Sequence, residues 1–256
     1  MLEQLIIFFK NIPRHMRHSR YRIVQQRQVL LLTLFSALML IVLLKIVLNV
    51  FAVAEITQAT MMYRLVGLIA FSVIFIAIWM NYKNFPRDYY VTRHFNSNPM
   101  LHILISSAVY SLILSILLAV IGCVKPVNAD TLIKGVIFYT VMTYIFIVLL
   151  SYLLGLVRVI YIKLDKIYFV IAGIAFVLLP IILIRATLHG SLVHILMLNP
   201  LYYLVNGFQE SVIVGSEAFN HMGYHFYFIC WLGFISVIAF ALNDYVSQLR
   251  PNEHIQ

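Results

Sequence analysis

Charged residues are scarce in this sequence, and their scarcity decides the class of protein. Asp, Glu, Lys and Arg together make up 11% of the 256 residues, whereas a soluble domain contains about a quarter. Hydrophobic residues reach 63%, and the mean hydropathy is +0.96. This composition excludes a water-soluble globular protein and indicates that most of the surface faces lipid.

The sequence also lacks the short motifs by which enzymes and nucleotide-driven pumps act. It contains no H-E-x-x-H zinc motif, no G-x-S-x-G nucleophile elbow and no G-x-x-x-x-G-K-[ST] nucleotide-binding loop. All nine acidic residues lie in predicted loops, span ends or terminal segments, whereas ion-coupled carriers bury carboxylates at mid-span. We therefore predict that the chain is not an enzyme, has no catalytic residue and holds no cofactor.

Cysteine and histidine give no sign of a disulfide framework or a metal site. The two cysteines, Cys123 and Cys230, lie far apart in sequence, at or within predicted spans. His221 and His225 are four residues apart and can share a helix face, but a zinc site needs at least a third ligand. We expect no metal site and interpret the two histidines as residues at the membrane interface.

Long apolar runs, by contrast, are abundant. A helix needs about 20 apolar residues to cross a hydrocarbon core of about 30 Å, and spanning segments must be helical because lipid offers no hydrogen bonds to the backbone. The run from Met100 to Val124 contains no charged residue. Six runs meet the length, at about residues 29–51, 63–82, 101–123, 136–157, 167–185 and 222–243.

The predicted fold class is therefore an all-α, polytopic integral membrane protein with six transmembrane helices. We expect one transmembrane domain over residues 1–256, made of an arm (1–28), the six spans (29–243) and a tail (244–256). Ala52-Val53-Ala54 fits a signal-peptidase site. The apolar run before it, however, is longer than the apolar region of a secretory signal peptide, which has about 7 to 15 residues. The first run is thus predicted to be an uncleaved span.

The distribution of Lys and Arg predicts the orientation. With six spans, thirteen of the 18 basic residues fall on the side of the two termini, four lie near span ends on the other side, and Lys45 lies inside the first span. The positive-inside rule then places both termini in the cytoplasm. The net charge of +9 indicates topology and contact with anionic membrane lipids, not a nucleic-acid partner. Lys45 either extends to the headgroups or lines a path for an anionic cargo.

The arm at residues 2–27 combines an apolar face with a basic segment. Leu2, Leu5, Ile6 and Phe9 share one helical face before Pro13 interrupts. This pattern favours an amphipathic helix that lies flat on the cytoplasmic interface. A basic arm that only fixes the topology explains the same residues equally well.

The connection between the second and third predicted spans is rich in aromatic residues. Pro86 can begin a short amphipathic helix in this loop, and Asn98-Pro99 can end it. One interpretation is a docking surface for a cytoplasmic partner. The other is an interfacial aromatic belt, which tyrosine commonly forms.

The connection between the fifth and sixth predicted spans, residues 185–221, is semi-apolar but too interrupted to cross. Asn199-Pro200 should break a helix, and Gly207 and Gly215 interrupt the residues after this pair. Short apolar segments of this kind are often re-entrant. We expect two short helices that dip into the outer leaflet and return, with Glu210 either at an exit or facing water.

The order of these parts resembles the membrane permeases of type-2 ABC exporters for cell-surface polysaccharides and teichoic acids. The residues that carry the resemblance are the stretch from Asn199 to Gly215, the stretch from Leu154 to Ile167, the Phe85-Pro86 pair and the Leu-Arg-Pro sequence in the tail. The resemblance implies a subunit of the cytoplasmic membrane of a bacterium. Its cargo would be a lipid-linked anionic glycan or teichoic acid polymer, moved by alternating access.

The resemblance also implies partners and sites. The chain would form a homodimer with a second copy of itself and bind two copies of an ATPase subunit, which would hold the ATP and Mg²⁺. The expected ATPase-docking residues are Phe85, Pro86, Arg87, Asp88, Tyr89, Tyr90, Arg93 and Phe95. The gate through which substrate enters would contain Arg14, Arg17, Arg20 and Arg22. The re-entrant segment that caps the exit would contain Asn199, Pro200, Tyr202, Tyr203 and Glu210.

Two functions of other classes fit the same composition. The chain is alternatively an integral membrane enzyme or an accessory factor of envelope polymer synthesis. A scaffold or assembly subunit is the third interpretation.

Overall fold

The structure is a helical bundle. The computed structural model describes residues 2–94, 99–182, 190–215, 219–220 and 222–248, with the backbone alone at 2–19, 93–94 and 190. Within these residues all regular structure is helical, so the all-α prediction is confirmed. The elements are α1 (Leu2–Val50), α2 (Glu55–His94), α3 (Met100–Val124), α4 (Ile133–Ile160), α5 (Leu164–Val177), α6 (Gly190–Met197), α7 (Pro200–Gln209), a π-helix (Glu210–Val214) and α8 (Met222–Gln248).

Five of these helices are long and apolar enough to cross a membrane, which confirms a multi-pass membrane protein. They contain the spans Arg20–Val50, Glu55–Thr92, Met100–Val124, Ile133–Ile160 and Met222–Gln248. The sixth predicted span is not confirmed, because α5 has only 14 residues and is about 21 Å long. Pro180 follows soon after its end, and proline both lacks an N–H and disfavours helix in the residue before it.

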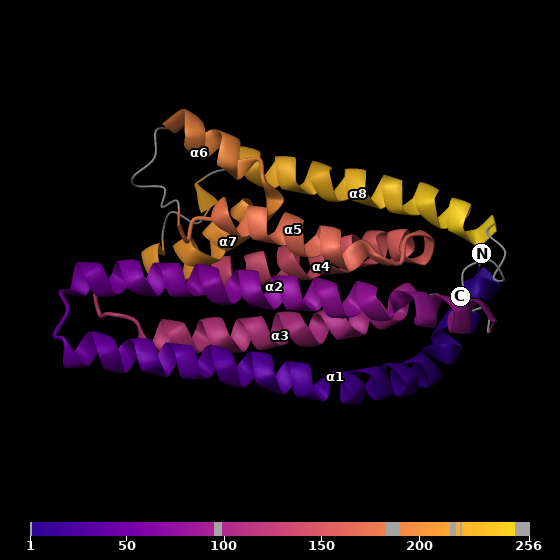
Figure 1. Ribbon diagram of the computed structural model, residues 1–256, viewed down its shortest axis with the longest axis horizontal. Coiled ribbons are helices and arrows are strands. Elements are labelled where there is room, and N and C mark those ends of the chain that lie inside the picture. The colour runs from indigo at the N-terminus through magenta and orange to yellow at the C-terminus, as the bar shows by residue number, and fades with distance from the viewer. Residues whose placement is uncertain (1, 95–98, 183–189, 216–218, 221, 249–256) are drawn as a thin grey trace.

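The helices run side by side, and their connections gather at two ends of the bundle (Figure 1). α1 begins and α8 ends at one end, where α4 also ends and α5 begins. We call this the basic end, because the helix parts that meet there contain most of the described basic residues: Arg20 and Arg22 in the first half of α1, Lys83 and Arg87 in the last turns of α2, Arg158 at the end of α4, and Lys163 and Lys166 at the start of α5. The turn from α1 to α2, the connection from α3 to α4, and the short helices α6 and α7 lie at the opposite end (Figure 1).

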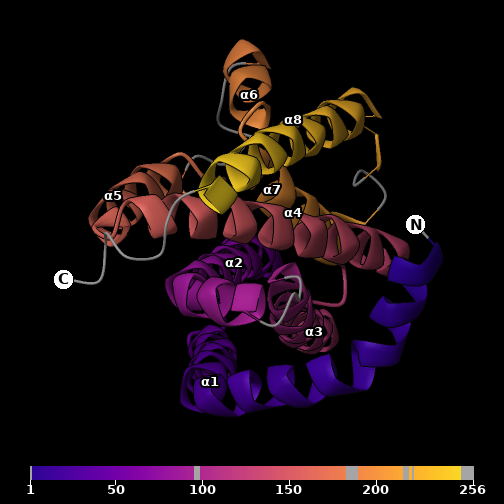
Figure 2. The same ribbon diagram turned by 90° about the vertical axis from the view of Figure 1, so that its right-hand side faces the viewer.

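Two helices continue through prolines at which the sequence predicts a boundary. α1 passes through Pro13 without interruption, so the arm is not a separate helix; its first part curves across the basic end (Figure 2). α2 passes through Pro86, so this proline does not begin a new helix but lies within a 40-residue one. Each proline removes one helical hydrogen bond. A helix in lipid or at its boundary nevertheless persists, because little water is available there to replace its remaining backbone hydrogen bonds.

α2 is the central helix. It packs against α1, α3, α4 and α7, and 56% of its most apolar stretch is buried, against 17% for α1. The main core runs along the bundle, and a second, smaller core lies at the basic end around Phe85, Tyr89 and Leu156. Gly155 of α4 allows α2 and α4 to lie close together there, because a Cβ at this position would lie 2.5 Å from Cγ of Phe85.

Candidate functional site

The segment from α6 to the π-helix, residues 190–214, is here named the short-helix segment. Its two α-helices are separated at Leu198 and Asn199, so the predicted break at Asn199-Pro200 is confirmed. Asn199 caps α7, because its side-chain oxygen accepts a hydrogen bond from the Leu201 N–H at 3.0 Å. Pro200 occupies the first helical turn, where its missing N–H costs nothing.

α7 lies inside the bundle, although it carries several polar residues. Every residue from Tyr202 to Ile213 is buried. Glycines on both sides allow this depth: a Cβ at Gly207 would lie 2.1 Å from a ring carbon of Tyr139 on α4, and one at Gly67 of α2 would lie 2.4 Å from the amide nitrogen of Gln209. α7 is therefore closely packed between α2 and α4, whereas α6 packs against α7 and exposes Leu192 and Ile195.

The π-helix ties this segment to the connection between α3 and α4. It ends at Gly215, whose φ of +82° suits glycine, and the Gly215 N–H donates to the Glu210 carbonyl at 2.7 Å. Two other carbonyls of the π-helix accept from outside: the Leu132 N–H donates to Ser211 at 2.8 Å, and the Thr131 hydroxyl donates to Val212 at 2.9 Å. Single π turns occur often at functional sites.

A polar network joins the short-helix segment to α2. The Tyr63 hydroxyl donates to the side-chain oxygen of Asn206 at 3.0 Å, and the Asn206 amide donates to Glu210 at 2.9 Å. The Gln209 amide donates to the Tyr63 carbonyl at 2.9 Å. Glu210 is 4% exposed. Because a buried carboxylate needs hydrogen-bond partners, the network holds Glu210 inside the bundle and not at a water-facing tip.

His225 of α8 is also buried within the bundle. Its Nδ1 forms a hydrogen bond with the Tyr203 hydroxyl, and its ring lies 5.1 Å from Phe138 and 6.0 Å from Tyr139. His221 lies outside the described residues. Among the residues that the structure describes, no three His, Cys, Asp or Glu side chains come close enough to hold a metal ion. The two cysteines are exposed thiols.

At the basic end an ion pair joins α1 to α2. Arg22 donates to Asp88 through Nε at 2.9 Å and through Nη2, and the two side chains are 11% and 10% exposed. Two further hydrogen bonds tie α3 to these helices: Ser106 donates to Gln26 at 3.3 Å, and Asn81 donates to Ser107 at 2.9 Å. The polar side chains thus fix the helix positions at this end.

A second ion pair anchors the start of α5. Arg158 at the end of α4 binds both carboxylate oxygens of Asp165, with Nη2 3.1 Å from Oδ2. The Tyr82 hydroxyl of α2 donates to the same carboxylate at 2.9 Å. The hydrogen bond from Arg158 holds the pKa of Asp165 below its ordinary value, and the hydrogen bond from Tyr82 and the charge of Lys83 lower this pKa further.

The residues expected to dock an ATPase differ in their positions. Phe85, Asp88 and Tyr89 are buried within the chain, so in this conformation they support the end of α2 instead of forming its surface. Pro86 and Tyr90 are half-buried, and Arg87 is exposed. The side chain of Arg93 and all of Phe95 lie outside the described residues.

The arginines expected to form the gate also differ in exposure and in their contacts. Arg20 is exposed, whereas Arg22 is committed to Asp88. The side chains of Arg14 and Arg17 lie outside the described residues. Lys45 is half-buried on α1, toward the opposite end from these arginines.

Sequence reasoning identified Asn199, Pro200, Tyr202, Tyr203 and Glu210 but missed their partners. Asn206 lies three residues before Gln209 and four residues before Glu210, a spacing that places these polar side chains on one helix face. That spacing was the available signal. No local pattern, however, indicates Tyr63, which is 143 residues from Asn206.

In comparisons with models of protein families and with curated proteins, the chain matched no family and no protein.

Proposed function

We propose that the chain is the membrane subunit of an ATP-driven ABC exporter that moves a lipid-linked anionic glycan or teichoic acid polymer across the cytoplasmic membrane. The observation that carries the proposal is the continuity of α2. This single helix of 40 residues bears the expected docking region at the basic end and contacts the short-helix segment near the other end.

The contacts along α2 suit the transmission of a rigid movement. At the basic end Asp88 is paired with Arg22, and Phe85 packs against Gly155. Toward the other end, Gly67 lies against Gln209, and Tyr63 binds Asn206. Because closely packed elements shift as units, a force applied to the basic end of α2 would reach the short-helix segment without local deformation.

The chemistry of the chain fits a subunit that is driven by another. The sequence has no nucleotide-binding loop, so ATP and Mg²⁺ belong to a separate ATPase, bound in two copies to a dimer of this chain. The concentration of Lys and Arg at one end favours a cytoplasmic position of both termini. Exposed arginine also suits a cargo that carries phosphate groups, since its planar guanidinium pairs with phosphate oxygens.

In this proposal the short-helix segment closes the exit on the outer side of the membrane. The short-helix segment is held from three sides, by Tyr63 of α2, by Thr131 and Leu132 before α4, and by the His225 ring of α8. A cap of this kind opens only when the helices that hold it move together. Movement of α2 by the ATPase would supply that coordinated step.

Co-purification tests the docking surface. The Arg87→Glu variant reverses an exposed charge at the basic end of α2, and it should detach the ATPase subunit and abolish ATP-dependent export in reconstituted vesicles. Arg64→Glu is the matched control, since it makes the same change at an exposed position near the other end of the same helix. An intact complex and unchanged export in the Arg87→Glu variant would contradict docking at this end.

A second measurement separates the exporter from an enzyme. The purified chain, incubated without ATP and without any partner, should leave a lipid-linked substrate chemically unchanged. Turnover under these conditions would replace the exporter proposal with the envelope enzyme.

A further inference from the structure

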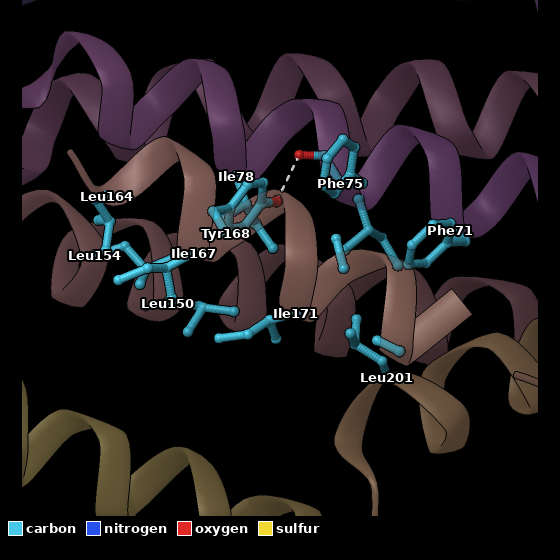
Figure 3. Close-up of a pocket in the computed structure, with 13 residues that line it drawn as sticks. Phe71, Phe75, Ile78, Leu150, Leu154, Leu164, Ile167, Tyr168, Ile171 and Leu201 are labelled. Atoms are coloured by element: carbon cyan, nitrogen blue, oxygen red, sulfur yellow. Dashed lines mark hydrogen bonds between the residues drawn. The ribbon is translucent and has the colours of Figure 1, made fainter. Parts of the chain in front are cut away.

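An apolar hollow lies between α5 and the rest of the bundle. It has a volume of about 210 Å³ and is lined by twelve residues from α2, α4 and α5 together with Leu201 of α7. Leu164 and Leu154 lie at one end of the hollow, and Phe71 and Leu201 lie at the other (Figure 3). The hollow therefore extends along α5 from the basic end toward the short-helix segment.

The hollow exists because α5 is attached to α2 by large rings and not by close backbone packing. Tyr168 stacks on Phe75 with ring centroids 4.9 Å apart, and its hydroxyl donates to the Phe75 carbonyl at 2.9 Å (Figure 3). Phe176 lies 5.4 Å from Phe71. These rings join α5 to α2, and the hollow beside them is walled by aliphatic side chains such as Leu150 of α4 and Ile171 of α5.

The walls of the hollow select an apolar occupant. The hydroxyl of Tyr168, a polar group among the lining residues, is already bound to the Phe75 carbonyl. Apolar cavities exclude water, because it finds no hydrogen-bond partners there. Ile167 and Ile171 line the hollow and are also 45% and 59% exposed, so the space is open to whatever surrounds α5. In a membrane that surrounding is the hydrocarbon of lipid chains.

The length of the hollow and the charge at its end specify the occupant further. α5 is about 21 Å long, and the hydrocarbon of one leaflet is about 15 Å thick, so one acyl chain fits along this helix. Three exposed lysines belong to the chain near the start of α5: Lys163 and Lys166, which flank Leu164 in sequence, and Lys83 of α2, whose charge acts on Asp165 and whose Nζ lies 4.6 Å from the centroid of the Trp79 ring. The nearby acid, Asp165, is bound by Arg158 and Tyr82. The end of the hollow is thus positively charged.

We propose that this hollow is a lipid-binding site, which holds one acyl chain of an anionic phospholipid with its phosphate headgroup at Lys83, Lys163 and Lys166. The bound lipid fills the space between α4 and α5 that side chains leave empty. The site goes beyond the proposed export function and does not depend on it, because all of its residues lie outside the docking surface and, apart from Leu201, outside the short-helix segment.

Photo-crosslinking tests the proposal. The full-length protein is reconstituted in phosphatidylcholine vesicles that contain a trace of phosphatidylglycerol with a diazirine on its acyl chain. After illumination, peptide mapping should locate the label on the lining residues of α4 and α5, around Leu150, Leu154, Ile167 and Ile171. Unlabelled phosphatidylglycerol should compete with the label at least fivefold better than phosphatidylcholine.

Two matched substitutions add the same phenylalanine ring, one inside the hollow as the test and one outside it as the control. Ala172→Phe places a ring into the hollow and should reduce the labelling at least fivefold. Gly173→Phe is the control one residue away, where an added Cβ meets no atom within 4 Å, and it should leave the labelling unchanged. Replacing the three lysines with Gln should remove the preference for phosphatidylglycerol, since each basic residue near an anionic headgroup contributes about fivefold.

Three results would overturn the proposal. Equal competition by phosphatidylcholine and phosphatidylglycerol in the unmodified protein would remove the headgroup site, and this measurement needs no variant to fold. Full labelling of the Ala172→Phe variant would place the lipid elsewhere. A photoreactive amino acid placed at Ile171 that crosslinks to a second copy of the chain and not to lipid would make the hollow a protein interface. None of these outcomes bears on whether an ATPase binds at Arg87, so failure of this proposal and failure of the export proposal can be distinguished.

Discussion

The contact between Gly207 and Tyr139 gives the sharpest prediction about stability. Replacing Gly207 with Ala places a Cβ 2.1 to 2.5 Å from three carbons of the Tyr139 ring. The ring cannot move away easily, because Tyr139 is 3% exposed and is surrounded by Tyr203, Phe208 and His225. Overpacking of a well-packed core costs about 1 to 3 kcal/mol, while Ala in place of Gly within a helix returns about 1 kcal/mol. We expect a net loss of up to about 2 kcal/mol.

A double-mutant cycle in detergent measures this contact. The free energy of unfolding is followed by titration with a denaturing detergent for the Gly207→Ala, Tyr139→Leu and double variants. Because Leu is shorter than Tyr, the substitution at residue 207 should cost much less when residue 139 is Leu, and the coupling should be about 1 kcal/mol or more. The cycle thereby separates a steric clash from any general effect of changing α7.

The Gly173→Ala variant provides the control on α5. At this position a Cβ meets nothing within 4 Å, so the helix preference of Ala should act alone and leave the protein equally or more stable. If Gly207→Ala is as stable as Gly173→Ala, the steric reasoning about α7 is refuted. The same refutation applies if the Tyr139→Leu background does not relieve the loss.

Three further substitutions test the ends of the bundle. Asp88→Asn should lower the free energy of unfolding by about 1 to 3 kcal/mol, because it leaves the partly buried Arg22 without its charge partner, and the loss should be smaller when Arg22→Met is also present. Asn199→Ala should cost about 1 kcal/mol through loss of the cap on α7, measured by the same titration, whereas Asn199→Ser should retain most of the stability. The pKa of Asp165 is depressed below its ordinary value of 3.8, so its contribution to stability is present above that pH and is lost as the pH falls through the lower folded value. The difference in thermal stability between the unmodified protein and Asp165→Asn should therefore be largest near neutral pH and shrink below about pH 4, and a difference that grows on acidification would reverse the assigned direction.

The long spans could be predicted from the sequence because lipid imposes one solution on a long apolar run. Each of the five spans must satisfy its backbone hydrogen bonds internally, so composition alone locates them. The ends of helices depend on local signals that the environment can override. Pro13 and Pro86 each break helices in water, yet α1 and α2 continue through them. The reverse happened at Pro180, where an apolar run was long enough but its helix ended at Val177.

The candidate site was predictable where it depends on neighbours in the chain. Asn199 and Pro200 act within one turn, and the break that they cause was predicted from their chemistry alone. The burial of Glu210 was not predictable in this way, because its partner Asn206 is itself held by Tyr63 of α2, which is 143 residues away in sequence. Phe85 and Tyr89 are intermediate: their four-residue spacing marks one helix face, but only the continuation of α2 turns that face inward.

The packing divides the bundle into parts that are joined with different strength, and this division bears on how the chain would move if it acts as the proposed exporter. α2, α4 and α7 approach one another at glycines, and α2 and α7 also share partly buried hydrogen bonds, so the three helices form one body. α5 is attached by stacked rings and an ion pair at its start, with a hollow beside it, and α1 buries little of its length. A force at the basic end should therefore carry α2 and the short-helix segment together, while the looser contacts of α1 and α5 absorb the displacement. A lipid chain that fills the hollow would then stiffen an internal boundary that the side chains of α4 and α5 leave open.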